Sequence, residues 1–370
     1  MTDKDVFFMQ RAIELARRGT GWVNPNPQVG AVIVKDGRII GEGYHERYGG
    51  LHAERNAIAL STESVAGATL YTTLEPCCHT GKTPPCTEII IEQKLARAVI
   101  GSHDPNPLAA GKGIALLKEA GIEVVCSFMQ HECDQLNRIF FHYIQTGMPY
   151  VLMKYAMTLD GKTATRTGAS RWITGEAARE DVHRLRGRYA AIMVGIGTVL
   201  ADDPLLNCRI TDGHNPLRII CDSHLRIPLN SQIAQTATTY PTLIVTLLND
   251  TEKITQLKQQ GCEVLVMSSP PQKNPTDGSH IDLKALMSLL GAREIDSVLI
   301  EGGPTLHASA LEAGIVNRLR CYVAPKLFGG SGARPAIEGL GVATPDEAYH
   351  LTDVSFEVFG EDYCFEGEVG

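Results

Sequence analysis

Apolar and polar positions alternate along the first part of the chain in two periods, one typical of strands and one typical of helices. Residues 29–35 and 39–44 are β-rich runs that flank Asp36-Gly37, a dipeptide typical of hairpin turns. Such runs alternate with stretches of helical periodicity, which predicts a mostly parallel sheet with helices on both faces. The predicted helices are 6–18, 52–62, 84–94, 112–120 and 130–145, and the further strands are 68–73, 97–101 and 122–126.

The pattern breaks at Thr146-Gly147-Met148-Pro149 and then restarts. A strand is predicted at 150–156, a helix at 175–187 and, from its Pro-rich polar composition, a loop at 268–280. The remaining runs predict a helix at 304–313 and strands at 190–194, 217–221, 242–246, 262–266, 296–300, 317–324, 354–359 and 362–368. Since 370 residues are enough for two cores, we expect two α/β domains, residues 1–147 and 148–370.

Charge and composition narrow the function classes. The chain carries 34 basic and 42 acidic residues, a net charge of −8, and neither predicted domain is basic, which disfavours nucleic-acid binding. The longest nearly apolar stretch, 189–201, is about 13 residues, short of the roughly 20 that a membrane span needs. Charged residues among the first twenty argue against a secretory leader. We therefore expect a cytoplasmic protein whose ten cysteines are reduced thiols, catalytic groups or metal ligands.

The strongest chemical signal is His52-Ala53-Glu54, followed by Pro76-Cys77 and then Cys86. Zinc deaminases hold Zn²⁺ with one His and two Cys, leave the fourth position for water, and use a nearby Glu that is not a ligand. The metal acidifies the water, and the carboxylate moves protons during the displacement of an amine. The first turn of a helix would let His52 and Glu54 reach one pocket, and Cys86 follows two prolines that favour a helix start.

Other interpretations of these residues stay open on spacing alone. Deaminases commonly carry Pro-Cys-x-x-Cys, whereas eight residues separate Cys77 from Cys86 here. Cys78 or His79 could replace Cys77 as a ligand. A zinc site with a fourth protein ligand, or buried thiols without metal, are the structural alternatives, and they leave Glu54 without a role. The seven cysteines beyond this region are scattered singly, which favours packing.

A second signal is the turn at 301–306, Glu-Gly-Gly-Pro-Thr-Leu, between a predicted strand and a predicted helix. Free backbone N–H groups at such a helix start can bind a pyrophosphate, although an ordinary strand-to-helix turn has the same pattern. Gly195-Ile-Gly197 resembles the start of a dinucleotide fingerprint, but Leu200 stands where the third glycine belongs, so we do not interpret it as a Rossmann site.

Together these residues resemble the bifunctional riboflavin-biosynthesis deaminase–reductase family. The resemblance covers nearly the whole chain in one order, and the Cys-x8-Cys loop is specific to that family. It is carried by residues 24–30 (NPNPQVG), 43–45 (GYH), 52–54 (HAE), 74–86 (LEPCCHTGKTPPC), 104–107 (DPNP), 111–113 (GKG), 158–162 (TLDGK), 170–174 (SRWIT), 197–204 (GTVLADDP), 301–305 (EGGPT) and 324–327 (APKL).

The resemblance implies a cytidine-deaminase-like three-layer αβα domain followed by a dihydrofolate-reductase-like α/β domain. The first would hydrolyse an amino group from a diaminopyrimidinone ribose phosphate, and the second would reduce the ribosyl side chain to ribityl with NADPH. It implies one Zn²⁺ per chain on His52, Cys77 and Cys86, with Glu54 as the proton shuttle. The residues implied to line the deaminase substrate pocket are Asn26, His45, Ala53, His79 and Lys82.

For the second domain, the resemblance also implies contact residues and a homo-oligomer formed through this domain. The NADP contacts would be Ala156, Trp172, Thr198, Asp202, Ser223, Gly303, Pro304, Thr305, Leu306, His307, Ala308 and Ser309. The substrate contacts would be Lys154, Ser170, Arg186, Leu205, Arg209 and Glu301, with the arginines suited to its phosphate. Two other functions compete: a nucleic-acid or nucleotide zinc deaminase with an accessory domain, and a non-catalytic zinc-stapled binding module.

Overall fold

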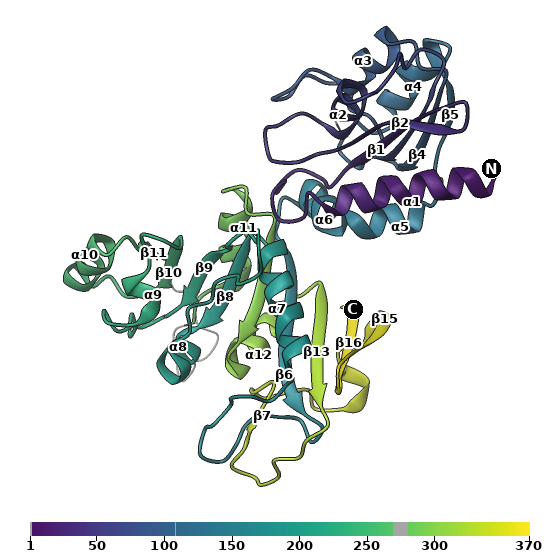
Figure 1. Cartoon of the computed structure of the whole chain (residues 1–370). Helices are drawn as coiled ribbons and strands as arrows, with labels where there is room; N and C mark the ends of the chain where they lie inside the picture. The colour runs from purple at the N-terminus through teal and green to yellow at the C-terminus, as the bar shows by residue number, and fades with distance from the viewer. Residues whose placement is uncertain (1, 108, 269–279) are drawn as a thin grey trace. The chain divides into compact units, whose positions relative to one another are not determined.

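The computed structural model describes residues 2–107, 109–268 and 280–370, so the predicted loop at 268–280 falls almost wholly outside the described residues. The chain divides into two compact units, Met1–Met148 and Pro149–Gly370 (Figure 1). Each unit is built around its own sheet.

The first unit holds a five-stranded sheet in the order β2-β1-β3-β4-β5. The predicted hairpin of residues 29–35 and 39–44 is present as the antiparallel pair β1 and β2, and β3, β4 and β5 are parallel as expected for a mostly parallel sheet. β1 also runs antiparallel to β3. A tight turn at Asp36-Gly37 joins β1 to β2, and such a turn can only join antiparallel strands. The strands are β1 (Gly30–Lys35), β2 (Arg38–Tyr44), β3 (Thr69–Leu74), β4 (Arg97–Ser102) and β5 (Glu123–Val125).

Helices cover both faces of this sheet and make a three-layer αβα unit (Figure 1). Alternate residues of β1 enter two separate cores: Ile33 packs with α2, α3 and α4, whereas Val32 packs with α1 and α5. The helices are α1 (Asp3–Arg17), α2 (Ala53–Ala59), α3 (Cys86–Glu92), α4 (Lys112–Glu119), α5 (Gln130–Leu136) and α6 (Arg138–Thr146).

The single helix predicted over 130–145 is two helices. Asn137 separates them with φ of −114°. Its side-chain oxygen accepts a hydrogen bond from the Gln28 amide at 2.8 Å, and its side-chain nitrogen donates to the Gln28 carbonyl at 3.0 Å. Asparagine side chains compete in this way with helical hydrogen bonds, so this long-range contact explains the break.

The second unit holds a nine-stranded sheet in the order β11-β10-β9-β8-β12-β6-β13-β16-β15. The first seven strands of this order are parallel, and the β15–β16 hairpin adds two antiparallel strands at one edge. The strands are β6 (Tyr150–Thr158), β8 (Ala191–Gly195), β9 (Leu217–Cys221), β10 (Thr242–Thr246), β11 (Glu263–Val266), β12 (Ser297–Gly302), β13 (Arg318–Ala324), β15 (Leu351–Phe359) and β16 (Asp362–Val369), beside a separate ribbon of β7 (Lys162–Ala164) and β14 (Arg334–Pro335).

Several helices of this unit connect consecutive parallel strands. The sequence pattern predicted only two of them, α7 (Glu176–Arg188) and α12 (Pro304–Glu312). The helices that it missed are α8 (Ile196–Asp202), α9 (Gln232–Gln235), α10 (Thr251–Gln259) and α11 (Leu283–Gly291), and a short 3-10 turn, η1, lies at Pro345–Glu347.

Candidate active sites

In the first unit, two helix starts and one loop converge on the predicted metal ligands. His52 is the residue that caps α2, Glu54 lies in the first turn of that helix, and Cys86 is the first residue of α3. Cys77 lies in the loop between β3 and α3. Helix α2 packs directly on β2 at Gly43, where an added Cβ would lie 2.3 Å from the Ala57 nitrogen. Because Gly43 has no side chain, α2 can lie directly against β2, and this contact fixes the distance between the start of the helix and the sheet.

The geometry of the three side chains fits a zinc ion. Their ligand atoms lie within 4.8 Å of one another, and His52 Nδ1 is 3.4 Å from Cys77 Sγ and 3.5 Å from Cys86 Sγ. With Zn–S of about 2.3 Å and Zn–N of about 2.0 Å, tetrahedral ligands would stand roughly 3.6 Å apart. In the described part of the chain, neither Cys78 nor His79 joins this group.

Hydrogen bonds around these ligands hold them in place. The Cys86 amide donates to Cys77 Sγ at 3.3 Å, and Thr83 Oγ1 lies 3.2 Å from His52 Nε2. With Nε2 engaged by Thr83, Nδ1 is the nitrogen that faces the sulfurs, which is how outer groups orient a metal-ligating imidazole. A hydrogen bond with the Cys86 side chain, followed by those of the His52 ring and the Cys86 amide, outweighs burial and lowers the pKa of the Cys77 thiol, which favours the thiolate that metal binding needs.

Glu54 is a buried carboxyl group beside this cluster. It is 3% exposed, and burial, followed by the charge of Cys77, raises its pKa. A carboxyl group with a raised pKa exchanges protons more readily near neutral pH than an exposed one does. The surroundings of Glu54 therefore suit proton transfer.

The structure brings some of the predicted pocket residues to this site. Asn26 donates from Nδ2 to His45 Nε2 at 3.2 Å, His45 Nδ1 donates to the Leu51 carbonyl at 3.0 Å, and the His45 ring stands 5.4 Å from that of His52. Ala53 is buried at the start of α2. Lys82 places its Nζ 3.7 Å from the centre of the Tyr48 ring, and His79 is partly exposed in the same loop.

Sequence reasoning missed three residues that organise this loop. Besides Thr83, Arg55 donates to the carbonyls of Pro84 and Pro85 at 3.1 and 2.7 Å. The buried Glu75 carboxylate accepts from the Gly111 and Ile114 amides at 3.1 and 3.2 Å. Arg55 directly follows Glu54, and Glu75 directly precedes Pro76-Cys77. Adjacency to the metal motif was therefore the available signal for both residues.

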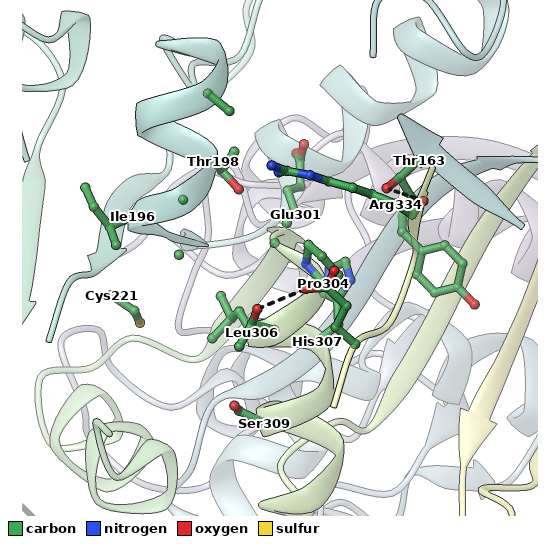
Figure 2. Close-up of a pocket in the computed structure, with 18 of the residues that line it drawn as sticks. Thr163, Ile196, Thr198, Cys221, Glu301, Pro304, Leu306, His307, Ser309 and Arg334 are labelled. Atoms are coloured by element: carbon green, nitrogen blue, oxygen red, sulfur yellow. Dashed lines mark hydrogen bonds between the residues drawn. The ribbon is translucent and has the colours of Figure 1, made fainter. Parts of the chain in front are cut away.

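In the second unit, a cavity of about 550 Å³ lies at the carboxyl ends of four neighbouring parallel strands, β6, β12, β8 and β9. Figure 2 shows Glu301 of β12 and the start of α12 in this cavity, with Thr198 of α8 beside them. Gly303 has φ of 79°, in the left-handed region that favours glycine. Ligands of open α/β sheets bind at this end of the strands.

A buried ion group adjoins the cavity. Arg186 of α7 donates from Nε and Nη2 to the two oxygens of Glu301 at 2.7 and 2.8 Å, and Lys154 Nζ lies 3.8 Å from Glu301 Oε2. Burial acts to raise the pKa of Glu301, but the charges of Arg186 and Lys154 outweigh it and lower that pKa. Burial also lowers the pKa of Lys154. Glu301 therefore stays ionised and anchors both cations.

Most of the residues predicted for the reductase site line this cavity, and five of them do not. The lining residues are Lys154, Ala156, Ser170, Thr198, Asp202, Ser223, Glu301, Gly303, Pro304, Thr305, Leu306, His307 and Ser309. The predicted residues outside this lining are Trp172, Arg186, Leu205, Ala308 and Arg209.

Sequence reasoning also missed cavity residues from outside the motifs. Thr163 and Arg334 face the cavity from the β7–β14 ribbon, where Thr163 Oγ1 donates to the Arg334 carbonyl at 3.4 Å (Figure 2). His224 and Arg226 reach it from the turn after β9. The glycine-rich run before Arg334 was a usable signal, whereas the other residues have none in the sequence.

Comparison with known proteins decides the family. The family model for the RibD C-terminal domain matches residues 149–365, and the model for the cytidine and deoxycytidylate deaminase zinc-binding region matches residues 2–102. The riboflavin biosynthesis protein RibD of Actinobacillus pleuropneumoniae is 54% identical over 362 residues, which cover 98% of this chain and 94% of that protein. The chain belongs to the RibD family. The resemblance inferred from the motifs is thus confirmed.

Other RibD proteins match over almost the same length. The protein of Escherichia coli is 40% identical, with 98% of each chain covered. A solved structure of RibD from Acinetobacter baumannii is 37% identical, with a TM-score of 0.86 and 100% of this chain and 99% of that chain covered. A Thermotoga maritima structure, described as a diaminohydroxyphosphoribosylaminopyrimidine deaminase/5-amino-6-(5-phosphoribosylamino)uracil reductase, is 36% identical, with a TM-score of 0.87 and the same coverage.

Membership of the RibD family settles the class of activity. The chain is a bifunctional enzyme of riboflavin biosynthesis, a deaminase followed by a reductase, which acts on a small molecule with Zn²⁺ and NADPH as cofactors. The expected fold class is confirmed, and this function is favoured over the two competing ones. None of the helices in the described part of the chain has the length and apolar character of a membrane span.

Proposed function

We propose that the first unit hydrolyses the amino group of a 2,5-diamino-6-ribosylamino-4(3H)-pyrimidinone 5′-phosphate, with His52, Cys77 and Cys86 holding Zn²⁺ and Glu54 moving protons. The observation that carries this proposal is a buried carboxyl group that stands beside a His/Cys/Cys group without belonging to it. A purely structural zinc site has no use for such a group.

The chain's own residues divide the work of deamination. When bound, Zn²⁺ supplies Lewis acidity that lowers the pKa of a water molecule. Glu54 accepts a proton from the attacking water and delivers protons to the ring nitrogen and the leaving amine. The neutral tautomer of His45, fixed by Leu51, leaves Nε2 as an acceptor beside Asn26. We assign the remaining contacts with the pyrimidine and its phosphate to Ala53, His79 and Lys82.

Single serine substitutions test the ligand assignment. Cys77→Ser and Cys86→Ser should each lose zinc on dialysis, whereas Cys78→Ser should retain it, because only the first two thiols face His52 Nδ1. Metal content per chain measures the outcome. The assignment would be overturned if the Cys78→Ser protein lost its zinc while the Cys77→Ser protein retained it.

For the second unit, we infer that NADPH reduces the ribosyl group of the deaminated intermediate in the cavity at the strand ends. NADPH supplies the hydride. Glu301 and Lys154 line this cavity, and Arg186 pairs with Glu301 from behind the lining. We assign the substrate phosphate to Arg186 and Arg209. Lys154, Ser170 and Leu205 complete the proposed substrate contacts.

The cofactor would lie along the turn between β12 and α12. At the start of α12, the amides of Gly303, Thr305 and Leu306 precede the first helical hydrogen bond, which the His307 amide donates to the Gly303 carbonyl at 3.0 Å. Thr198 of α8 lies against Gly302. An added Cβ at Gly302 would stand 3.2 Å from Thr198 Oγ1, so these two lining residues of the cavity pack closely against each other. We assign Ala156, Trp172, Asp202 and Ser223 to the same cofactor.

A coupled assay on the pyrimidine substrate tests both halves together. Ammonia release should occur without NADPH, and NADPH oxidation should require the deaminated product. Single-stranded RNA and transfer RNA should release no ammonia, since the chain carries a net charge of −8. Ammonia from RNA but not from the pyrimidine would favour the nucleic-acid deaminase, and zinc without ammonia from either substrate would favour the binding module.

We also propose a homo-oligomer formed through the reductase unit, in the cytoplasm. The edge hairpin β15–β16 exposes Val354, Phe356 and Val358 at 54–58%, and an edge strand with exposed apolar side chains is a pairing surface. All ten cysteines are free thiols, which supports a reducing compartment. Phe356→Asp should shift the mass measured by analytical ultracentrifugation toward one chain, and an unchanged mass would place the interface elsewhere.

A further inference from the structure

The turn that follows β9 points an acidic side chain inward. Asp222 is fully buried, and its Oδ2 accepts a hydrogen bond from the Ile227 amide at 2.8 Å. Its Oδ1 lies 3.9 Å from Arg226 Nε. The Leu225 amide donates to the Asp222 carbonyl at 3.0 Å, and Leu225 has φ of 50°. These contacts make a tight turn in which the Asp222 carboxylate is engaged by the Ile227 amide and Arg226 of the same turn.

The same turn presents hydrogen-bond donors to the cavity. Ser223, His224 and Arg226 line the cavity, whereas Asp222 does not. The Arg226 side chain is 55% exposed, so its guanidinium is accessible. The acidic residues of the cavity lie on other elements: Asp202 ends α8, Glu301 is paired with Arg186 on β12, and Glu338 follows β14.

This arrangement bears on which nicotinamide cofactor is bound. NADPH differs from NADH by a phosphate on the 2′-oxygen of the adenosine ribose. Sites for NADH place a carboxylate where it accepts the 2′-hydroxyl, and sites for NADPH place an arginine there instead. In this chain the carboxylate is turned away and the arginine is turned toward the cavity. Guanidinium groups also match phosphate oxygens better than other cations do.

We propose that Arg226, with Ser223 and His224, recognises the 2′-phosphate and makes the reductase selective for NADPH over NADH. The proposal rests on the cofactor site proposed above and adds the residue that discriminates. Asp222 is a positioning residue, since it holds both the Ile227 amide and the Arg226 side chain.

The spacing of the strands agrees with this role. β9, β8 and β12 are adjacent in the sheet, and two strand spacings of about 4.8 Å separate the end of β9 from that of β12 by roughly 10 Å. In NADPH, the adenosine ribose carries the pyrophosphate on its 5′-carbon and the extra phosphate on its 2′-oxygen, so a single sugar separates the two groups. With the pyrophosphate at the Gly303 turn, the 2′-phosphate therefore reaches the end of β9.

Titration calorimetry on the full-length protein tests the proposal with two probes, 2′,5′-ADP and 5′-AMP, which differ only in the 2′-phosphate. Arg226→Gln should weaken 2′,5′-ADP binding about 10- to 150-fold, the loss of one charge-assisted hydrogen bond, and leave 5′-AMP binding unchanged. Arg226→Lys should recover part of the loss. Arg334→Gln is the matched control, because Arg334 lines the same cavity from another element, and it should leave the ratio of the two affinities unchanged.

The outcomes distinguish a failure of the proposed role of Arg226 from a failure of the proposed cofactor site. Dissociation constants for NADPH and NADH, measured on the same proteins, should converge in Arg226→Gln. A retained preference for 2′,5′-ADP over 5′-AMP in Arg226→Gln would overturn the role of Arg226 while the cofactor site stands. Absence of binding of every nucleotide to the unmodified protein would overturn the cofactor site and this proposal with it.

Discussion

Glu54 and Glu301 are both enclosed carboxyl groups, yet their neighbours push their pKa values in opposite directions. Burial and the Cys77 charge raise the pKa of Glu54. Around Glu301 burial acts in the same sense, but Arg186 and Lys154 outweigh it and lower the pKa. A carboxyl group of the first kind can carry a proton, whereas one of the second kind stays ionised and orients cations.

Replacing Glu54 by glutamine should abolish deamination while zinc is retained. The amide keeps the size of the side chain but cannot accept and return a proton, and general acid–base catalysis contributes about 10²- to 10⁴-fold. Ammonia release and metal content on the same preparation measure the effect. Stoichiometric zinc with at least about a tenth of normal ammonia release, well above that range, would remove Glu54 from the mechanism.

His183 should position Arg209 in the reductase. Burial, and then the charges of Arg186 and Arg209, lower the pKa of His183 to about 4. The ring is therefore neutral at pH 7, and its Nε2 accepts a hydrogen bond from Arg209 Nε at 3.1 Å. His183→Ala should raise the KM for the phosphorylated intermediate about tenfold, the loss of roughly 1.4 kcal/mol.

Matched measurements separate positioning from folding. His183→Gln keeps an acceptor oxygen and should recover most of the KM, while kcat and the dissociation constant of NADPH should stay unchanged in both variants. A fall in kcat with an unchanged KM would show that His183 acts elsewhere. Equal effects in the Ala and Gln variants would exclude the hydrogen bond as the cause.

At the level of elements, the sequence predicted best where apolar periodicity and turn chemistry agree. The hairpin around Asp36-Gly37 and the long runs of β6 and β13 are examples. The missed helices α10 and α11 begin at Asp250 and Asp282, whose side chains cap them, so a capping signal existed and was not used. The break at Asn137 could not be found, because its partner Gln28 is distant in sequence.

The two sites likewise differ in how far local sequence patterns predicted them. The grouping of His52, Cys77 and Cys86 was predictable because the residue types and their helix-start positions indicate one chemistry. The role of the second unit came from family resemblance, since its cavity is assembled from four strands and a separate ribbon. Arg334 and Arg226 enter that cavity from elements far apart in sequence. A glycine-rich run precedes Arg334, whereas no local pattern marks Arg226.

The attachment of α1 to the sheet gives a stability prediction with a defined pH window. Burial acts to raise the pKa of Asp5, but hydrogen bonds from Tyr71 at 2.7 Å and from Thr2, together with Arg97, outweigh it and hold that pKa well below its usual range. Asp5→Asn should therefore lower the free energy of unfolding of the first unit by about 1–3 kcal/mol at pH 7.

The sign of the pH dependence follows from linkage. A carboxylate with a lowered folded-state pKa contributes stability above its unfolded pKa of about 3.9, and this contribution is lost as the pH falls further. Urea unfolding should show a constant gap between Asp5→Asn and the unmodified protein from pH 7 to about 5 and a narrowing gap below about 4. A gap that widens on acidification would contradict the ionised Asp5.

At the scale of the whole molecule, the two units are complete in themselves. Each has its own sheet and buried core, and each proposed site draws its residues from one unit alone. The chemistry of the two reactions is independent as well, because hydrolysis needs no reductant and reduction needs no zinc. Joining both activities on one chain therefore requires no shared catalytic residue.

The two activities should separate cleanly. A protein of residues 1–147 should release ammonia without NADPH, and full-length Glu54→Gln should still reduce the deaminated intermediate. Arg209→Ala should lose about 10- to 150-fold in reductase kcat/KM, since a hydrogen bond to a charged group contributes roughly 1.5–3 kcal/mol, with deamination unchanged. Steady-state kinetics of both half-reactions on each protein provide the comparison. An equal loss of both activities in Arg209→Ala would show that the units depend on each other, and a loss of neither would place the phosphate site away from Arg209.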